Sequence, residues 1–385
     1  MLYWAPKGSY YISDRALLLG YMTQTSLQQL IIERIQREGP ITFAEYMRMA
    51  LYEPGYGYYV TGPARMGWEG DYYTSTDVAT FFAHCMGRQL HQWWDKLGRP
   101  ARFNVLEQGA GRGHLGSEIE VWARQADATF HDALEYYTED IRLGQDVRAR
   151  AHEASDRPVP AVILSNELID AFPVHIVETR QGQLYEVYVD VEAGKLREVL
   201  GTPSTAEVAD YLNSYNIPWS SFGDGWRAEI NLDALRWMQQ VAQRLRRGFI
   251  LTIDYGDKAR ELYTRYRRRG TLACYFQHQM HERPLIHPGQ QDITAHVNFS
   301  ALITEGRRQG FRLHKFTTQR LWLEEMGISQ ELEQLRTSKF AAADTERATD
   351  HGQVALLQWY NLRQRVAALT DPTGMGNFKV LVLRR

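Results

Sequence analysis

Residues 103–116 constrain the fold of this chain more than any other segment. Phe-Asn-Val-Leu-Glu107 has the pattern of a short buried strand that ends in an acid, and the residues from 108 to 116 form a glycine-rich loop that opens a helix. Glycines at this place let the backbone approach a ligand at the C-terminal edge of a parallel sheet. The segment therefore predicts an α/β protein that binds a nucleotide-like cofactor.

Two sequence patterns overlap in this loop. Glu107 with Gly109, Gly111 and Gly113 is the pattern of S-adenosylmethionine (SAM) methyltransferases, whereas Gly111 and Gly113 with Gly116 complete the dinucleotide-binding fingerprint. A carboxylate is repelled by the pyrophosphate of NAD but attracted by the ammonium and sulfonium of SAM. Glu107 therefore favours SAM over a dinucleotide. A glycine-rich turn without a ligand is the third interpretation.

Three further residues are candidates for cofactor binding. Glu139 follows the next predicted strand, where an acid accepts hydrogen bonds from ribose hydroxyls, although the same acid would serve NAD. Asp71 and Thr74 precede the sheet, where methyltransferases often close a lid over SAM. The alternative for the segment around Thr74 is N-capping of a helix that starts near Asp77.

From residue 103 onward, strand patterns alternate with helix patterns, which indicates a doubly wound α/β sheet. We expect strands at 103–107, 134–138, 161–164, 249–254, 311–317 and 378–383. A terminal strand that runs antiparallel in an otherwise parallel sheet is typical of methyltransferases. The predicted fold is thus α/β, with a Rossmann-like class I methyltransferase sheet, a helical N-terminal leader and inserted segments on the substrate side.

The chain divides into a leader, core parts and two insertions. In the leader we expect a helix after Ser26 that ends at Gly39, a second that is capped by Thr42, and a third from Asp77 to about Leu97. Residues 184–190 alternate apolar and polar positions, which predicts an antiparallel hairpin. The predicted parts are the leader and lid (1–100), the SAM-binding half (101–173), the first insertion (174–231), a core helix and strand (232–254), the second insertion (255–298) and the C-terminal core (299–385).

Bulk composition excludes several classes of protein. The chain has 385 residues, with 44 Lys and Arg against 46 Asp and Glu, so it shows no electrostatic footprint for nucleic acid. We interpret the one run of basic residues, 265–269, as a solvent-exposed face of a helix or loop and not as a phosphate-binding site. Two cysteines form neither a disulfide framework nor a thiolate zinc site. No segment predicts a signal peptide or membrane insertion, so we expect a cytoplasmic protein. We expect residues 1–21 to be a tail or an artefact of start-site choice.

Further segments, in a fixed order, carry a family resemblance. They are residues 39–47, 53–59 and 70–75 before the glycine loop, and 164–175, 254–256, 288–299, 318–319, 326–328 and 375–380 after it. With the loop, this set resembles the MidA family of class I SAM-dependent methyltransferases over about residues 27–384. Mitochondrial members of that family methylate an arginine of a respiratory complex I subunit. The resemblance implies SAM as cofactor and arginine on a partner protein, such as a respiratory-complex subunit, as acceptor.

An arginine acceptor needs carboxylates, because its pKa exceeds about 12 and the guanidinium must be oriented and deprotonated. Glu167 and Asp170 follow the third predicted strand and share one face if the segment is helical; a structural ion pair or helix cap is the alternative. Asn166 completes the catalytic candidates. Methyltransferases of nucleic-acid bases have Pro-Pro-aromatic after such an Asn, but Glu167-Leu168 follows here, which argues against bases as acceptors.

Other polar residues have weaker patterns. Asp254 is an acceptor-site carboxylate or a turn residue before Gly256, and His175 is a proton acceptor or a hydrogen-bonded histidine at a strand start. The second insertion contains four histidines, namely His278, His281, His287 and His296. They lack the His-x-x-x-His spacing of a metal site, so we expect them to be hydrogen-bonding loop residues and expect no metal. The rival hypotheses for the whole chain are a catalytically silent SAM-binding assembly factor or chaperone, and, less favoured, an NAD-dependent oxidoreductase.

Overall fold

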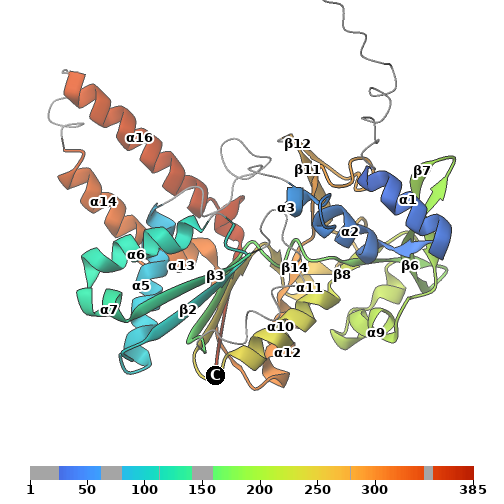
Figure 1. Cartoon of the computed structure of the whole chain (residues 1–385), viewed down its shortest axis with the longest axis horizontal. Coiled ribbons are helices and arrows are strands. Elements are labelled where there is room, and N and C mark those ends of the chain that lie inside the picture. Colours follow the sequence, from blue (N-terminus) through green and yellow to red (C-terminus); the bar gives the residue numbers. More distant parts are fainter. Residues whose placement is uncertain (1–25, 62–79, 112, 141–158, 278, 342–349) are drawn as a thin grey trace, which may run out of the picture.

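A computed structural model describes residues 26–61, 80–111, 113–140, 159–277, 279–341 and 350–385. Figure 1 shows two parts side by side: a central sheet flanked by helices, and a smaller lobe built from residues 26–61 of the leader and the two insertions. A pair of helices, α14 and α16, extends away from the sheet on the side opposite this lobe. The segments 1–21 and 70–77, for which we made predictions, lie outside the described residues.

The central sheet has, among the described residues, six strands in the order β15-β16-β9-β4-β2-β3. The predicted fold class is confirmed, and the predicted strand ends agree with the observed ones to within two residues. The strands are β2 (Phe103–Gln108), β3 (Leu134–Glu139), β4 (Val162–Asn166), β9 (Phe249–Asp254), β15 (Arg312–Thr318) and β16 (Lys379–Arg384).

The last strand has the direction that the sequence predicted. β2 pairs in parallel with β3 and β4, and β4 pairs in parallel with β9. β16 runs antiparallel to both of its neighbours, β9 and β15. The carboxyl ends of β2, β3, β4 and β9 therefore meet at one edge of the sheet, which is where ligands of such folds bind.

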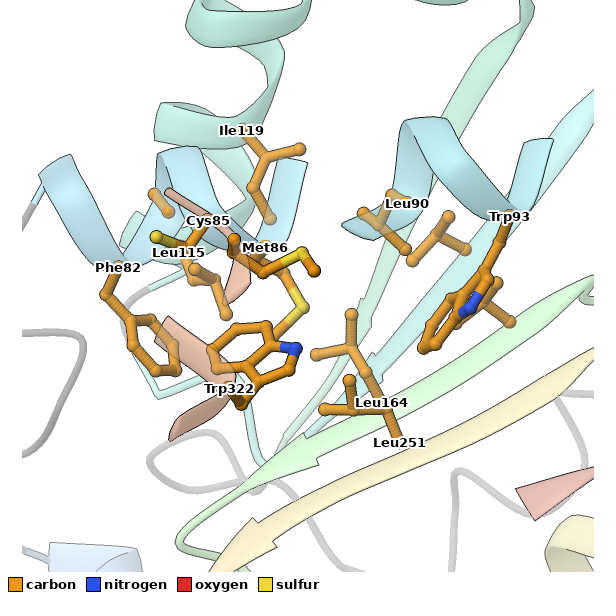
Figure 2. Packing of buried hydrophobic residues seen from close by; sticks show 14 of the residues in the cluster. Phe82, Cys85, Met86, Leu90, Trp93, Leu115, Ile119, Leu164, Leu251 and Trp322 are labelled. Atoms are coloured by element: carbon orange, nitrogen blue, oxygen red, sulfur yellow. The ribbon is translucent and has the colours of Figure 1, made fainter. Parts of the chain in front are cut away.

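The strands are nearly continuous apolar runs whose successive side chains point to opposite faces, so the sheet buries both of its faces. Val162 and Leu164 of β4 point to one face and Ile163 to the other. The first face packs on α5 (Thr80–Lys96), α6 (His114–Ala126), α7 (Ala128–Ala133) and α13 (Gln319–Glu325). Figure 2 shows Met86 and Trp93 of α5, with Trp322 of α13, packed around Leu164 and Leu251 of the sheet. The opposite face packs on α10 (Leu232–Arg244) and α12 (Phe299–Arg308).

The leader begins as predicted. Helix α1 (Leu27–Glu38) starts at the Ser26 cap and ends at Gly39, and Thr42 caps α2 (Phe43–Tyr52) by accepting from the Glu45 amide. A short helix, α3 (Tyr58–Thr61), follows the tyrosine-rich turn. Leader residues form one apolar cluster with residues of both insertions.

The first insertion folds as an antiparallel sheet that also includes a leader strand. The predicted hairpin is present as β5 (His175–Arg180) and β6 (Gln183–Glu192). The sheet is completed by β7 (Lys195–Gly201), β8 (Arg227–Ile230) and the two-residue leader strand β1 (Ile41–Thr42), which pairs with β6. We did not predict β1. Helix α9 (Ala206–Ser214) and a 3-10 turn, η2 (Trp219–Ser221), connect β7 to β8.

The second insertion carries a small sheet of its own in the order β12-β11-β13. The strands are β11 (Ala273–Phe276), β12 (Gln279–His281) and β13 (Asp292–Thr294). β10 (Gly256–Asp257), α11 (Ala259–Leu262) and β14 (Val297–Asn298) attach the insertion to the core, with β10 parallel to β14. In Figure 1 the hairpin of β11 and β12 stands beside α3.

The C-terminal part of the chain adds helices to the first face of the sheet. α14 (Ile328–Ser338) and α16 (Asp350–Thr370) follow α13, and a 3-10 turn, η3 (Met375–Asn377), leads into β16. Glu331 of α14 contacts His84 and Arg88 of α5 through ion pairs. No helix in the described part of the chain is long and apolar enough to span a membrane.

Candidate active site

The glycine loop turns sharply at the carboxyl end of β2. Gly109, Gly111 and Gly113 all have positive φ angles, of 74°, 53° and 75°. A side chain at Gly109 would also lie 2.9 Å from Cδ1 of Leu168, in the segment that follows β4. The loop therefore requires glycine for its backbone conformation, and at Gly109 also for its contact with residues 166–170.

Gly116, which completes the dinucleotide pattern, has a packing role. It is buried in the first turn of α6, and a Cβ atom there would lie 2.6 Å from the ring of Tyr136 on β3. The Tyr136 phenol donates a hydrogen bond of 3.0 Å to Glu107 Oε2. Gly116 thus admits the ring that holds the acid at the end of β2. We did not predict the role of Tyr136, because its partner is 29 residues away.

Glu107 is a buried carboxylate with an unusual pKa. Its side chain is only 2% exposed, and burial raises its pKa to about 7, although the Tyr136 hydrogen bond acts in the opposite direction. A nearby cation would favour the ionised form. The site therefore fits the cationic amino-acid half of SAM, which is the role that the sequence predicted for Glu107.

Glu139 lies at the carboxyl end of β3, next to the glycine loop. Its backbone carbonyl accepts from the Gly109 amide, and its carboxylate accepts two hydrogen bonds from Arg244 of α10, at 2.7 and 2.9 Å. Gln108 Nε2 also donates to it, and Trp237 donates to Gln108. The carboxylate is thus fixed in orientation by an arginine of the opposite helix layer. Its predicted contact with ribose stays a prediction.

The segment after β4 departs from our conditional expectation of a helix. Residues 167–172 form a turn, and Glu167 has a φ angle of 50°. A left-handed conformation in a residue with a side chain is uncommon and costs energy, and such residues cluster at functional sites. The amide of Glu167 donates to Ile253 of β9, and Asn166 Nδ2 donates to the Glu167 carboxylate.

Asp254 holds this turn in place. It is fully buried at the end of β9, and its Oδ2 accepts hydrogen bonds from the amides of Ile169 and Asp170, at 2.9 and 3.3 Å. Its Oδ1 accepts from the amide of Tyr255. The sequence offered two roles for Asp254, an acceptor-site carboxylate or a turn residue before Gly256. The structure adds a third, support of the turn that carries Glu167 and Asp170, and the acceptor-site role stays a prediction.

Two buried oxygen atoms at this edge lack hydrogen-bond partners among the described residues, namely Asn166 Oδ1 and Asp170 Oδ1. Asp170 is 5% exposed, and burial raises its pKa to about 6, with the Tyr255 side chain acting in the opposite direction. Burial and the neighbouring Asp170 and Glu167 carboxylates raise the pKa of Asp254 well above its usual value. Unsatisfied buried acceptors are uncommon in proteins, and a water molecule or a ligand with N–H or O–H donors would satisfy these two.

Tyrosines from the leader and an acid from the second insertion complete this region. The Tyr59 phenol donates to Asp292 Oδ1 at 2.8 Å, and the Tyr52 phenol donates to the carbonyl of Ala171. The rings of Tyr52 and Tyr59 stack with centroids 5.6 Å apart. Asp292 also acts on Tyr275 of β11, where burial and the charges of Asp292, Asp170 and Glu167 raise the pKa. Sequence analysis missed these residues because their contacts join distant segments.

The histidines that we considered have separate surroundings. His175 Nδ1 lies 2.7 Å from Glu186 Oε1, so it is a hydrogen-bonded histidine at the start of β5. His287 stacks on Phe276, and the His296 ring meets the edge of Tyr255, where burial lowers the His296 pKa to about 4. No group of His, Cys, Asp and Glu suited to a metal ion occurs in the described ranges. His278, like Asp71 and Thr74, lies outside the described residues.

The sheet order, the antiparallel last strand and the acid-glycine loop at the end of β2 together define a class I methyltransferase. A family model described as "Putative S-adenosyl-L-methionine-dependent methyltransferase" matches residues 85–317. The chain therefore belongs to this family of MidA-like SAM-dependent methyltransferases, and its cofactor is SAM. SAM as the cofactor agrees with the methyltransferase pattern of the loop and not with the dinucleotide pattern.

The chain is similar to curated proteins and solved structures over most of its length. It is 27% identical over 93% of its length to the Drosophila melanogaster mitochondrial protein arginine methyltransferase NDUFAF7 homolog, covering 84% of that protein. It is 28% identical over 81% of its length to human mitochondrial NDUFAF7, also named a protein arginine methyltransferase, covering 75% of it. A Burkholderia thailandensis structure with bound S-adenosyl-homocysteine shares 29% identity at a TM-score of 0.77, covering 93% of this chain and 92% of that one.

Proposed function

We propose that this enzyme transfers the methyl group of SAM to an arginine side chain of a partner protein. The observation that carries the proposal is the acidic turn at the end of β4, where Asn166 and Asp170 present buried oxygens without partners in the described residues. A guanidinium has five N–H donors and binds carboxylates. The relatives named as protein arginine methyltransferases support the same acceptor.

On the cofactor side, we assign one role to each described residue. Glu107 receives the charged amino-acid half of SAM, the backbone of Gly109, Gly111 and Gly113 encloses it, and Glu139 receives the ribose hydroxyls. Arg244 keeps the Glu139 carboxylate in one orientation. When bound, SAM supplies an electrophilic methyl group on a sulfonium. Asp71 and Thr74 are proposed lid residues.

On the acceptor side, Glu167 and Asp170 orient the guanidinium and draw its positive charge away from the attacking nitrogen. Asn166 accepts one of its N–H groups through Oδ1. Because the pKa of Asp170 is about 6, this carboxylate is largely ionised at neutral pH and takes the proton that the acceptor nitrogen loses. Catalysis then consists mainly of alignment in a site from which water is excluded.

The acceptor partner in this proposal is a protein, and a respiratory-complex subunit is the candidate that the family resemblance suggests. We keep a cytoplasmic location as a prediction. The rival is an assembly factor that binds SAM and transfers nothing. The left-handed conformation of Glu167 favours the enzyme, because such residues cluster at functional sites and this one lies beside two buried acceptor atoms.

The test is a transfer assay with methyl-labelled SAM and a lysate from cells that lack this gene, followed by mass spectrometry of the labelled residue. We expect label on arginine with the native enzyme, and a loss of at least about a hundredfold with Glu167→Gln. The control is Glu192→Gln, at an exposed position of the first insertion. SAM affinity should be unchanged in both variants. Label on lysine only, or none at all despite SAM binding, would overturn the proposal.

A further inference from the structure

The three-stranded sheet of the second insertion has two unlike faces. Directly paired residues of antiparallel strands share a face. Cys274 pairs with Ile293 and His281, and Cys274 and Ile293 are fully buried in the cluster with the leader. This face is therefore part of the core of the lobe.

The other face leads from the acidic site to the surface. Tyr275 of β11 pairs with Asp292 of β13 on one side and with Met280 of β12 on the other, so these three side chains form one row. Their exposure increases along the row: Asp292 is 2% exposed, Tyr275 is partly buried and Met280 is 66% exposed. The inner end of the row lies beside the segment after β4, because Tyr59 donates to Asp292 and stacks on Tyr52. The Tyr52 phenol in turn donates to the carbonyl of Ala171, next to Asp170.

A hydrogen bond also joins the end of β13, which carries Asp292, to the turn after β4. The amide of Ala295, just after β13, donates to the carbonyl of Asp170. At the outer end, β12 pairs only with β11 among the described strands, so it is an edge strand. An exposed methionine on an edge strand is a surface that adapts to apolar partners and that an extended chain can approach.

We infer that the face formed by Asp292, Tyr275 and Met280 is the docking surface for the acceptor polypeptide, an inference that rests on the proposed function. Its occupant is an extended segment that carries the target arginine. The arginine enters between the acids of the β4 turn, and an apolar side chain of the same segment covers Met280. Two features select this occupant. The face is continuous with the acidic site, and the negative charge of Asp292 and of the site attracts a segment that carries an arginine.

Strand spacing sets the expected distance between these two side chains. Two spacings separate Asp292 from Met280, which is about 10 Å. An extended chain rises about 3.3 Å per residue. An extended segment therefore needs about three residues to span from Asp292 to Met280.

The test compares Met280→Asp with Leu357→Asp, a matched exposed apolar residue (65%) on α16, far from the site. The probe is the purified protein that accepts labelled methyl groups from the native enzyme. We expect Met280→Asp to raise the KM for this protein about tenfold, with kcat, SAM affinity and thermal stability unchanged. Leu357→Asp should match the native enzyme in all four.

An unchanged KM with Met280→Asp would overturn the docking surface while the proposed function stands. An equal rise in KM with both variants would do the same, because it would show a general effect of surface charge. If the native enzyme labels no arginine in any protein, the proposed function fails and the docking surface fails with it.

Discussion

The phenol of Tyr136 donates a hydrogen bond to the carboxylate of Glu107 across two neighbouring parallel strands, at 3.0 Å. The Glu107 side chain is deeply buried and Tyr136 is partly buried, and Gly116 of α6 leaves the space that the Tyr136 ring occupies. The acid that we assign to the charged half of SAM is therefore held by a group that no cofactor motif includes. This hydrogen bond, and the hydrogen bonds by which Asp254 supports the turn after β4, lead to four predictions.

Replacing Tyr136 with Phe removes the one hydrogen bond that lowers the Glu107 pKa. More of the carboxyl is then protonated at pH 7, and the attraction for the cofactor's cation weakens. We expect SAM affinity at pH 7 to fall about three- to tenfold, equivalent to about 1 kcal/mol, with recovery at pH 9. Calorimetric titration with SAM at both pH values measures this. A loss that is equal at pH 7 and pH 9 would contradict the ionisation argument.

Glu107 also makes stability depend on pH. Its folded pKa, about 7, lies above the usual 4.5, so the folded state binds more protons than the unfolded state between these values. The free energy of unfolding without SAM therefore falls as pH rises from about 4.5 to about 7. The shift corresponds to a penalty of up to about 3 kcal/mol above pH 7.

Replacement of Glu107 with Gln removes that penalty. We expect the variant to be more stable than the native chain at pH 8 and nearly equal at pH 5, while SAM binding is lost at both. Thermal unfolding at the two pH values, without cofactor, measures the difference. Glu333→Gln, at an exposed position on α14, is the control and should show no such pH dependence. A variant that is less stable at pH 8 would show that Glu107 is satisfied by charges within the protein.

The contact between Gly116 and Tyr136 gives a packing prediction. A methyl group at Gly116 meets the Tyr136 ring at 2.6 Å, so Gly116→Ala must displace the ring and with it the Glu107 hydrogen bond. We expect a loss of about 1 to 3 kcal/mol in unfolding free energy, together with weaker SAM binding. Arg124→Ala, further along α6 and exposed, should change neither. Chemical denaturation and SAM titration of both variants provide the measurements.

Asp254 gives a prediction for the acceptor side. In Asp254→Asn, an amide N–H₂ replaces one carboxylate oxygen, so at least one backbone donor among Ile169, Asp170 and Tyr255 loses its acceptor. We expect a stability loss of about 1 to 3 kcal/mol and a lower kcat, because Glu167 and Asp170 lose their fixed positions. SAM affinity should change little.

The matched control for this variant is Asp257→Asn, three residues further along the same segment, where the side chain is partly exposed. If Asp254→Asn keeps the native kcat in transfer assays while its stability falls, then Asp254 only supports the fold. A decrease in kcat with an altered pH profile would identify it as a positioning residue for the acids of the turn.

Local sequence patterns were sufficient to predict the central sheet. Its strands alternate between two helix-covered faces, so runs such as Phe249–Asp254 are continuous and apolar, and their ends are marked by glycine or acid. The leader caps at Ser26 and Thr42 were predicted for the same reason, because each depends on residues that are close in sequence. The antiparallel direction of the last strand was predicted from the kind of sheet that methyltransferases have.

The acceptor side was harder to predict because its contacts are long-range. Tyr59 and Asp292 are 233 residues apart, and Tyr46 reaches the carbonyl of Pro284 over 238. The sequence indicated Glu167 and Asp170 but not the turn that presents them, because Asp254 supports that turn from another strand. No local pattern predicts a two-residue strand such as β1.

The contact between the leader and the second insertion has a consequence for the order in which the parts of the enzyme fold. The leader leaves the ribosome first, but its hydrogen-bond partner Asp292 is made only after three quarters of the chain. Contacts of such high sequence separation form slowly. The contact that holds Tyr59 near the acidic turn can therefore form only after Asp292 has been made, whereas β3 and β4, the strands on both sides of β2, are complete by residue 166.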